Sequence, residues 1–238
     1  MITVKIAGLP IGIIHKHERI KIITKNYLTD EEPLFVVSAT PEHIEVEKKR
    51  VNDPQYGEDY YESLIIYRNI AEKLPEYDAF LFHGAAISYR GKAYIITANS
   101  GVGKTTHIRL WHSSFGDEVG IINGDKPIFR IIDGVAYAFG TPWQGKENYG
   151  RNVSAPIGGI AFLSRAAENK AYPISASEAV MFFMSQIYLP LEGREALSKT
   201  LMLADKLFSS VKLVKLECNM DPEAATVCRD ALLGEKDG

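Results

Sequence analysis

The stretch "ITANSGVGKTTHIRLW" occupies residues 96–111 and decides the fold predicted for the chain. The apolar run "KAYIITA", which leads into it, is typical of a strand, and "THIRLW" has the spacing of a helix. Small residues, two glycines and a lysine lie between them. We therefore predict a strand, a tight turn rich in backbone amides and a helix, which is the order that an anion-binding turn requires.

The turn matches the phosphate-binding pattern G-x-x-x-x-G-K-[ST] except at its first position, where Ala98 replaces glycine. In such a loop the N–H groups point inward at phosphate oxygens, and the helix dipole adds positive potential. Lys104 is predicted to reach the β- and γ-phosphates, and the Thr105 hydroxyl to hold Mg²⁺. The predicted nucleotide-binding residues are Asn99, Ser100, Gly101, Val102, Gly103, Lys104, Thr105 and Thr106. The alternative is a glycine-rich turn with a surface lysine.

A second anchor is predicted at Asp125, which follows Lys104 by 21 residues and comes just after the apolar run "EVGII". A helix of about ten residues rises ~15 Å and a strand of about five residues returns ~16 Å, so the chain is level with the loop again at Asp125. A carboxylate there would bind Mg²⁺, directly or through water, or accept the proton of a hydroxyl. The alternative is that residues 123–125, "NGD", form only a turn.

Composition limits the class of protein. The chain has 238 residues, of which 46% are hydrophobic and 24% charged, which is typical of a globular fold with a sizeable core. A formal net charge of −3 argues against nucleic acid as a partner. No run approaches the roughly 20 apolar residues of a membrane span, and the start lacks a signal-peptide pattern. With two cysteines, Cys218 and Cys228, we expect a soluble protein of a reducing cytoplasm.

Two regions are predicted. Residues 1–75 are expected to be strand-rich and packed on the core, with strands at "ITVKIAG", "RIKIITKNYL", "LFVVSAT" and "IEVEKK" and one helix, "YYESLIIYRNIAEKLPEY". Residues 76–238 are expected to form the nucleotide-binding core, with strands from "AFLFHGAAIS" to "VKLVKLE". Its later helices are "SASEAVMFFMSQIYL", "REALSKTLMLADKLFSS" and "DPEAATVCRDALL", the last capped by Asp221. The stripe "MFFMSQIY" is expected in the core, or at an interface with a second copy of the chain.

Three segments together carry a resemblance to a known family. "HGAAISYRGKAYIITANSGVGKTT", followed by "INGDKP" and "GTPWQGKE", resembles the HPr kinase and phosphoenolpyruvate carboxykinase superfamily, and more closely the small bacterial HPr kinase-like proteins found near peptide-modification genes. The resemblance implies a mixed α+β fold of the P-loop type, with curved mixed β-sheets and flanking helices. It also implies that Lys104 and Thr105 meet phosphate and Mg²⁺, that Asp125 is the second aspartate of an Asp-Asp pair, and that His83 lies beside the transferring phosphate. Gly124 stands where the family has the first aspartate, so that role falls to Asp125 or to another carboxylate.

Two further candidates have open interpretations. His83, in "FLFHGAAI", is either a satisfied core residue or a neighbour of the phosphates, because the hairpin after it leads back to the loop. The segment "GTPWQGKENYGRN", residues 140–152, is either a ligand-binding loop or a solvated hairpin loop with an anchoring tryptophan. As a ligand-binding loop it would use Lys146 and Arg151 to neutralise phosphate charge, and Trp143 to pack against a base or a substrate side chain.

Three functions are open on this basis. The first is a kinase that uses ATP and Mg²⁺ to phosphorylate a hydroxyl, with a serine of a peptide or small protein as the expected acceptor. Its catalytic residues would be Asp125, Lys104, His83 and Lys146, with Thr105 and Asp125 as metal ligands. The second is a kinase with a small-molecule acceptor. The third is a nucleotide-binding partner protein in which hydrolysis only switches a conformation.

Overall fold

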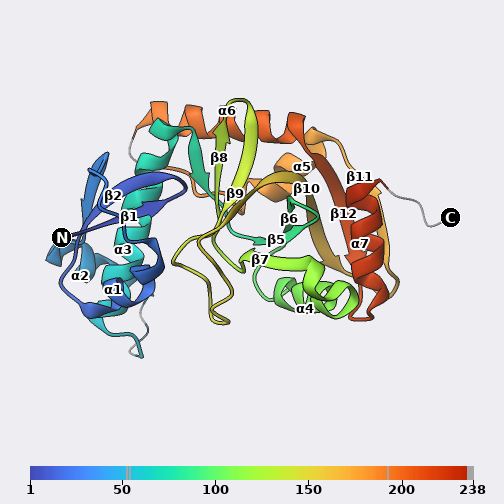
Figure 1. Cartoon of the computed structure of the whole chain (residues 1–238), viewed down its shortest axis with the longest axis horizontal. Helices are drawn as coiled ribbons and strands as arrows, with labels where there is room; N and C mark the ends of the chain where they lie inside the picture. Colours follow the sequence, from blue (N-terminus) through green and yellow to red (C-terminus); the bar gives the residue numbers. More distant parts are fainter. Residues whose placement is uncertain (52, 54, 192, 235–238) are drawn as a thin grey trace.

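The computed structural model describes residues 1–51, 53, 55–191 and 193–234. It has a mixed α+β fold with curled mixed sheets and flanking helices, as predicted from the sequence (Figure 1). An N-terminal region lies at one end of the molecule and a larger core at the other. Within the described residues no helix combines the length and the apolar character needed to cross a membrane.

The N-terminal region is a small three-stranded sheet packed on helices. The strand order is β1-β2-β3, with β1 and β2 antiparallel and β2 and β3 parallel. The longest helix of this region, α3, presents Ile66, Ile70 and Ala71 to the sheet, at the spacing of one helical face. The elements are β1 (Ile2–Ile6), β2 (Leu9–Ile14), α1 (Glu18–Thr24), η1 (Lys25–Tyr27), β3 (Phe35–Ser38), α2 (Pro41–Val51), α3 (Glu58–Lys73) and η2 (Leu74–Tyr77).

The core is a nine-stranded mixed sheet organised around its longest strand. Strand β10 pairs with β9 over its first residues and with β6 and β12 over its later ones, so the sheet curls along it. The strands are β4 (Ala79–Leu81), β5 (Ala85–Tyr89), β6 (Lys92–Thr97), β7 (Val119–Asn123), β8 (Ile128–Ile132), β9 (Val135–Phe139), β10 (Ser154–Arg165), β11 (Lys170–Pro173) and β12 (Lys212–Cys218). The other elements are α4 (Lys104–Phe115), η3 (Gly116–Glu118), α5 (Ala176–Phe183), α6 (Arg194–Ser210) and α7 (Glu223–Leu233).

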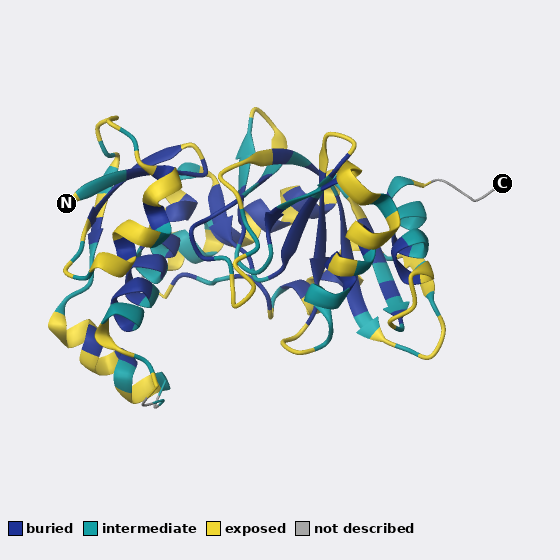
Figure 2. Cartoon of the chain, turned by 60° about the horizontal axis from the view of Figure 1, so that its bottom comes forward, coloured by how far each residue is buried: buried dark blue, intermediate teal, exposed yellow. Residues whose placement is uncertain are grey.

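Helices cover both faces of this sheet. One face packs against Phe183 of α5 and Leu207 of α6, and the opposite face packs against Trp111 of α4 and Cys228 of α7. Successive residues 93–96 of β6 and 160–163 of β10 therefore enter alternate clusters and are all buried, which explains why these stretches are apolar runs without alternation. Figure 2 shows these buried central strands beneath helices whose outer sides are exposed.

The N-terminal region packs directly on the core. One apolar cluster contains residues from both regions, among them Ile6, Leu74, Leu81 and Ile128. Arg130 of β8 donates from Nη1 to the Ala7 carbonyl oxygen at 2.9 Å. The two regions therefore share a continuous interior, and a site between them has walls held in fixed relation.

The strand-rich prediction for residues 1–75 is wrong in two places. "RIKIITKNYL" forms α1 and η1, and "IEVEKK" lies in α2. Two smaller predictions also fail: the single strand expected at "AFLFHGAAIS" is divided into β4 and β5, and the Asp221 side chain accepts from Asn219 rather than capping α7. Strands β2 and β11 were not predicted. The helix expected over "SASEAVMFFMSQIYL" is shorter, because α5 ends at Phe183, and the other strands and helices named in the sequence analysis form where they were expected.

Candidate functional site

Sheet topology brings the sequence candidates to one edge. Strands β6 and β7 are both antiparallel to β5 and so run parallel to each other, with their carboxyl ends at the same edge. The turn beginning at Ala98 follows β6, and Asp125 follows β7. His83 precedes β5, whose first residue Ala85 pairs with Ile96. The loop, Asp125 and His83 therefore converge, as the length estimate for the loop helix and its return strand predicted.

The turn has the geometry of a phosphate-binding loop. Gly101 and Gly103 have φ values of +78° and +132°, in the region that favours glycine. Open space surrounds both, since a Cβ on either would meet no atom within 4 Å. Helix α4 begins at Lys104, so its amino terminus points at this space. The Lys104 Nζ donates to the Ala98 carbonyl oxygen at 2.8 Å, which folds the lysine over the loop.

Lys104 and Asp125 influence each other electrostatically. Burial lowers the pKa of the Lys104 ammonium, and the negative charge of Asp125 partly offsets that effect. A phosphate bound in the loop would therefore meet a half-buried cation that gains stability from an added negative charge. The loop and its lysine fit a polyanionic ligand better than they fit a surface turn.

His83 and Asp125 form a pair at the centre of the site. The His83 Nε2 lies 3.3 Å from Asp125 Oδ1, and Lys126 Nζ lies 3.6 Å from Asp125 Oδ2. Burial by itself would raise the pKa of Asp125, but the hydrogen bond from His83 and the charges of Lys126 and Lys104 outweigh it, so the pKa lies below its ordinary value. Asp125 is thus a carboxylate near neutral pH. His83 is partly exposed rather than a satisfied core residue.

Asn123 holds this arrangement in place. Its side chain is fully buried, and its Oδ1 accepts from the amides of Asp125 at 2.9 Å and Lys126 at 2.6 Å. Its Nδ2 donates to the Thr141 carbonyl oxygen at 3.2 Å, the Thr141 Oγ1 at 3.1 Å and the Trp143 carbonyl oxygen at 3.2 Å. One side chain therefore joins the Asp125 turn to the start of the 140–152 loop.

The glycines of this region are required by close packing. A Cβ on Gly124 would lie 2.9 Å from the Tyr149 Cβ, and one on Gly145 would lie 3.0 Å from the Asp125 Cβ. Gly124 also donates its N–H to the Tyr149 carbonyl oxygen at 2.6 Å. An aspartate at position 124 would thus collide with the 140–152 loop. Close packing against this loop therefore explains why position 124 is a glycine.

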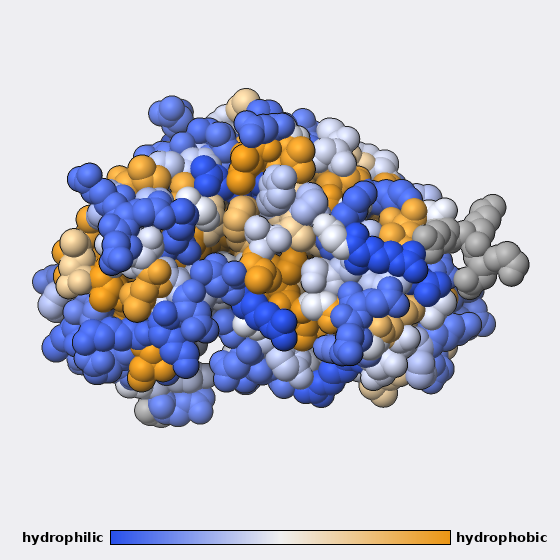
Figure 3. Space-filling view, in the orientation of Figure 1, coloured by the Kyte–Doolittle hydropathy of each residue, from blue (hydrophilic) through white to orange (hydrophobic). Residues whose placement is uncertain are grey.

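These residues line a cleft of about 910 Å³ between the core and the N-terminal region. A notch at the lower edge of the face in Figure 3 separates the two regions. His83, Lys104, Thr105, Asp125 and Lys146 all line the cleft, together with Ser100, Gly101, Gly103 and Thr106 of the predicted nucleotide-binding residues. Lys146 is exposed at its mouth.

The structure distinguishes the roles that were open for two side chains of the 140–152 loop. Trp143 follows the second interpretation: it is buried against Tyr67, with ring centroids 5.1 Å apart, and its Nε1 donates to Ser63 Oγ at 3.0 Å. It anchors the loop to α3. Arg151 is exposed and is not among the described residues that line the cleft. Lys146 is the cation of this loop that faces the predicted chemistry.

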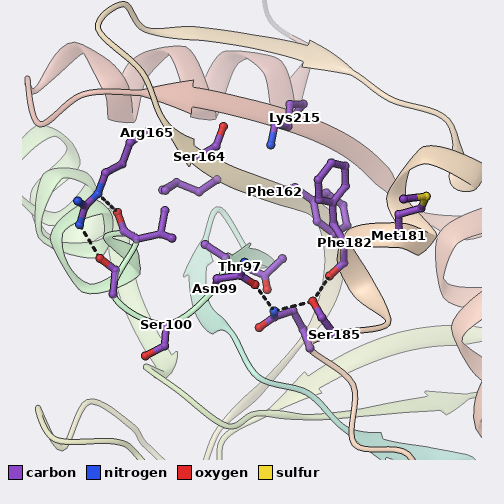
Figure 4. Close-up of a pocket in the computed structure, with 15 residues that line it drawn as sticks. Thr97, Asn99, Ser100, Phe162, Ser164, Arg165, Met181, Phe182, Ser185 and Lys215 are labelled. Atoms are coloured by element: carbon purple, nitrogen blue, oxygen red, sulfur yellow. Dashed lines mark hydrogen bonds between the residues drawn. The ribbon is translucent and has the colours of Figure 1, made fainter.

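A second hollow of about 600 Å³ lies on the other side of the phosphate loop (Figure 4). Asn99 and Val102 line it, whereas Ser100 and Gly101 line both hollows. Phe162 and Phe182 lie beside each other, with ring centroids 5.9 Å apart, and Lys215 Nζ is 4.6 Å from the centre of the Phe182 ring. Arg165, on the opposite side, donates to the carbonyl oxygens of Gly101 and Val102. The loop thus has an aromatic pocket on one side and the His83–Asp125 pair on the other.

Gln186 connects this pocket to the site. Its Nε2 donates to Asn99 Oδ1 at 3.1 Å, and its carbonyl oxygen accepts from the His83 amide at 2.7 Å. The side chain is buried, yet its Oε1 has no hydrogen-bond partner within the described part of the chain. The "MFFMSQIY" stripe that contains Gln186 is only partly core, since Phe183 is fully buried while Met181 is 81% exposed.

The expected metal ligands fit Mg²⁺ only together with a phosphate. Thr105 and Asp125 line the same cleft and offer one hydroxyl and one carboxylate. No group of three or more His, Cys, Asp or Glu residues suited to a metal occurs among the described residues. Mg²⁺ commonly has only one or two protein ligands and completes its coordination shell with substrate phosphates and water, so Thr105 and Asp125 are sufficient as its protein ligands.

Comparisons with known proteins give limited support. No protein-family model matches the chain, and no curated protein matches it. Among solved structures, the chain is similar to the Hpr(Ser) kinase/phosphatase from Coxiella burnetii, with a TM-score of 0.36 and 8% sequence identity over 65% of this chain and 97% of that one. Similarity at this level assigns neither a family nor the role of any residue to this chain.

Sequence reasoning missed Asn123 and Gln186 as members of the site. Asn123 was interpreted only as part of a turn. The side chain of an Asn commonly accepts a hydrogen bond from the backbone amide two residues later, so its place two residues before Asp125 was an available signal. Gln186 gave no signal, because its partner Asn99 is 87 residues away. The aromatic pair of the second hollow was also unforeseen, since Phe162 and Phe182 come from different elements.

Proposed function

We propose that the protein is a kinase that transfers the γ-phosphate of ATP to a hydroxyl group, with a serine of a peptide or small protein as the acceptor. The observation that carries this proposal is the convergence of the phosphate loop and the His83–Asp125 pair on one cleft. A nucleotide-binding turn alone would be compatible with a switch protein. A carboxylate held as an anion beside the lysine of the loop supplies the further group that transfer to a hydroxyl requires.

The nucleotide would lie across the loop. Its base would lie in the second hollow, where Phe162 and Phe182 offer aromatic surfaces. Its phosphates would follow the loop amides toward Lys104, which would leave the Ala98 carbonyl oxygen for the β- and γ-phosphates. The γ-phosphate would then face the large cleft and its carboxylate.

In the transfer step, the bond between the γ-phosphorus and the bridging oxygen of ADP breaks as a bond to the acceptor oxygen forms. Asp125 would orient the hydroxyl and accept its proton, and the low pKa of its carboxyl favours orientation as the larger part of that role. Lys104 and Lys146 would stabilise the charge that spreads over the transferring group. Thr105 and Asp125 would hold Mg²⁺, which when bound neutralises phosphate charge.

Mass spectrometry tests the proposal. The protein is incubated with Mg-ATP and a mixed pool of peptides and metabolites, with Asp125→Asn as the matched variant. The proposal predicts a gain of one phosphate on hydroxyl-bearing peptides, dependent on Asp125. Phosphate on metabolites alone would support a small-molecule kinase instead. ADP formation without any phosphorylated product would support the switch protein.

A further inference from the structure

Strand β10 carries an arginine to the side of the phosphate loop that faces the second hollow. It pairs in parallel with β6 as far as Phe162, the partner of Thr97, where β6 ends. β10 then continues for three more residues to Arg165, a distance of ~10 Å along a strand. This extension brings Arg165 level with the loop that follows β6, and its side chain lines the second hollow (Figure 4).

The Arg165 guanidinium holds two successive carbonyl oxygens of the loop. Its Nη2 donates to the Gly101 carbonyl oxygen at 2.5 Å, and its Nε donates to the Val102 carbonyl oxygen at 2.9 Å. An arginine presents these donors in a rigid planar fork, so the two bonds together fix the direction of both carbonyl groups.

The directions of the carbonyl groups also set those of the amide groups. The peptide bonds of the loop are trans, so each N–H points opposite to the carbonyl group of the preceding residue. Because both carbonyl groups turn toward Arg165, the N–H groups of Val102 and Gly103 point away from it. The Val102 N–H closes a turn by donating to the Asn99 carbonyl oxygen at 3.3 Å. Gly103 lines the large cleft, where the phosphates are expected, and is not among the described residues that line the second hollow.

The loop needs such a contact because its glycines leave it free to rearrange. Gly101 and Gly103, on either side of Val102, adopt positive φ values, and a Cβ on either would meet no atom within 4 Å. Glycine adopts positive and negative φ about equally readily, and here no packing restricts the choice. A peptide plane that turned over would present a carbonyl oxygen to the phosphates in place of an N–H group. The two bonds from Arg165 oppose that rearrangement.

We propose that Arg165 is a positioning residue, which prepares the loop for the phosphates of the nucleotide by holding the carbonyl groups of Gly101 and Val102 away from them. It acts through the loop and not on the ligand, since it lies on the carbonyl side, where the oxygens repel an anion. This inference rests on the proposed function in that the loop binds a nucleotide. It adds a residue that follows Lys104 by 61 positions and lies outside the motif.

The binding of two ligands to four proteins tests the inference. The ligands are Mg-ATP and inorganic tripolyphosphate with Mg²⁺, which offers phosphates without a base, and their affinities are measured by calorimetric titration. The proteins are the unmodified chain, Arg165→Ala, Arg165→Lys and Arg151→Ala. Arg165→Lys keeps the charge and loses the planar fork. Arg151→Ala is the matched control, because Arg151 is exposed and is not among the described residues that line either hollow.

The inference predicts that Arg165→Ala binds both ligands more weakly by the same factor of about ten, since fixing the backbone of one residue has roughly that effect on an equilibrium. Arg165→Lys should fall between Arg165→Ala and the unmodified protein, and Arg151→Ala should match the unmodified protein. In steady-state kinetics Arg165→Ala should raise the KM for ATP and change kcat by less than about twofold. Its melting temperature without ligand should stay within about 3 °C of the parent value, because Arg165 is exposed.

Four results would overturn the inference. The first is equal affinity of Arg165→Ala and the unmodified protein for both ligands. The second is a loss for ATP without a loss for tripolyphosphate, which would place Arg165 against the base. The third is full affinity in Arg165→Lys, which would show that the charge alone is sufficient. The fourth is a fall of more than about 5 °C in the melting temperature of Arg165→Ala without ligand, which would show a general stabilising role.

The proposed function fails in a different way. If the unmodified protein binds neither ligand, the proposed function is contradicted, and the inference with it. If it binds both ligands and transfers no phosphate, the kinase is contradicted, and the affinities of Arg165→Ala and Arg165→Lys still decide the role of Arg165 in the loop.

Discussion

Replacement of Asn123 by alanine tests the account of how the site is held together. Asn123 is fully buried and makes five hydrogen bonds, two accepted from the amides of Asp125 and Lys126 and three donated to acceptors on Thr141 and Trp143. Asn123→Ala leaves two buried N–H groups without a partner, each at a cost of about 1–3 kcal/mol. We expect the free energy of unfolding to fall by about 3–5 kcal/mol, a large share of the 5–15 kcal/mol typical of a folded protein.

Urea unfolding followed by fluorescence measures this change, and phosphate transfer is assayed well below the unfolding midpoint. Thr200→Val is the matched control, because Thr200 is equally buried and donates one hydrogen bond, to Ala196 in α6, far from the cleft. We expect Thr200→Val to cost about 1 kcal/mol and to leave transfer unchanged. An Asn123→Ala protein that loses less than about 1 kcal/mol and transfers phosphate normally would refute the reasoning.

Three other predictions concern single side chains. Asp125→Asn should keep nucleotide affinity within about tenfold and lower transfer by about a hundredfold or more, as measured by titration and by steady-state kinetics; transfer near the parent rate would move the role of the carboxylate elsewhere. Lys146→Ala should lower kcat with little change in nucleotide binding, whereas Arg151→Ala, outside the cleft lining, should leave both near parent values; equal effects would contradict the placement of this loop. Burial lowers the pKa of His107 to about 4. As the pH falls below about 6.5, this histidine therefore takes up a proton in the unfolded chain before it does so in the folded protein, which favours the unfolded chain. His107 alone should lower the free energy of unfolding by about 3 kcal/mol between pH 7 and pH 4. His107→Gln, whose amide oxygen can still accept from Trp111, should flatten that part of the stability curve, and an unchanged curve would show that folding does not lower the pKa of His107.

The sequence predicted the core well because its signals are local. The strand before the phosphate loop and the helix after it each follow from a few adjacent residues. The convergence of Lys104 and Asp125 followed from element lengths alone. The residue type alone did not show whether His83 is a core residue or a neighbour of the phosphates. The register of β5 against β6 determines its position beside the loop.

The N-terminal region was mispredicted because short helices give little periodicity. The buried residues are Ile20 and Thr24 in α1, and Ile44 and Glu47 in α2. Each helix therefore has only two buried residues, which are too few to reveal a helical period in the sequence. Alternating apolar residues on so short a segment fit a strand equally well. Packing against α3 decided the outcome, and the sequence does not show that contact.

The members of the site that sequence could not reveal are defined by distant partners. Asn123 bonds to residues 18 and 20 positions away, and Gln186 to one 87 positions away. Tyr60, Ser63 and Leu64 of α3 line the cleft only because the N-terminal region and the core share an interior. Such features become visible when the chain is folded, since neither motif nor spacing carries them.

The claim that residues 98–105 form a nucleotide-binding loop is tested most directly by the Mg-ATP thermal shift of the unmodified protein and of Lys104→Ala. A ligand at a hundredfold excess over its dissociation constant stabilises the folded state by about 2.7 kcal/mol. The account predicts that stabilisation in the unmodified protein and its loss in Lys104→Ala, with the melting temperature of the two proteins similar in the absence of nucleotide. A shift of equal size in both proteins, or none in either, would contradict it.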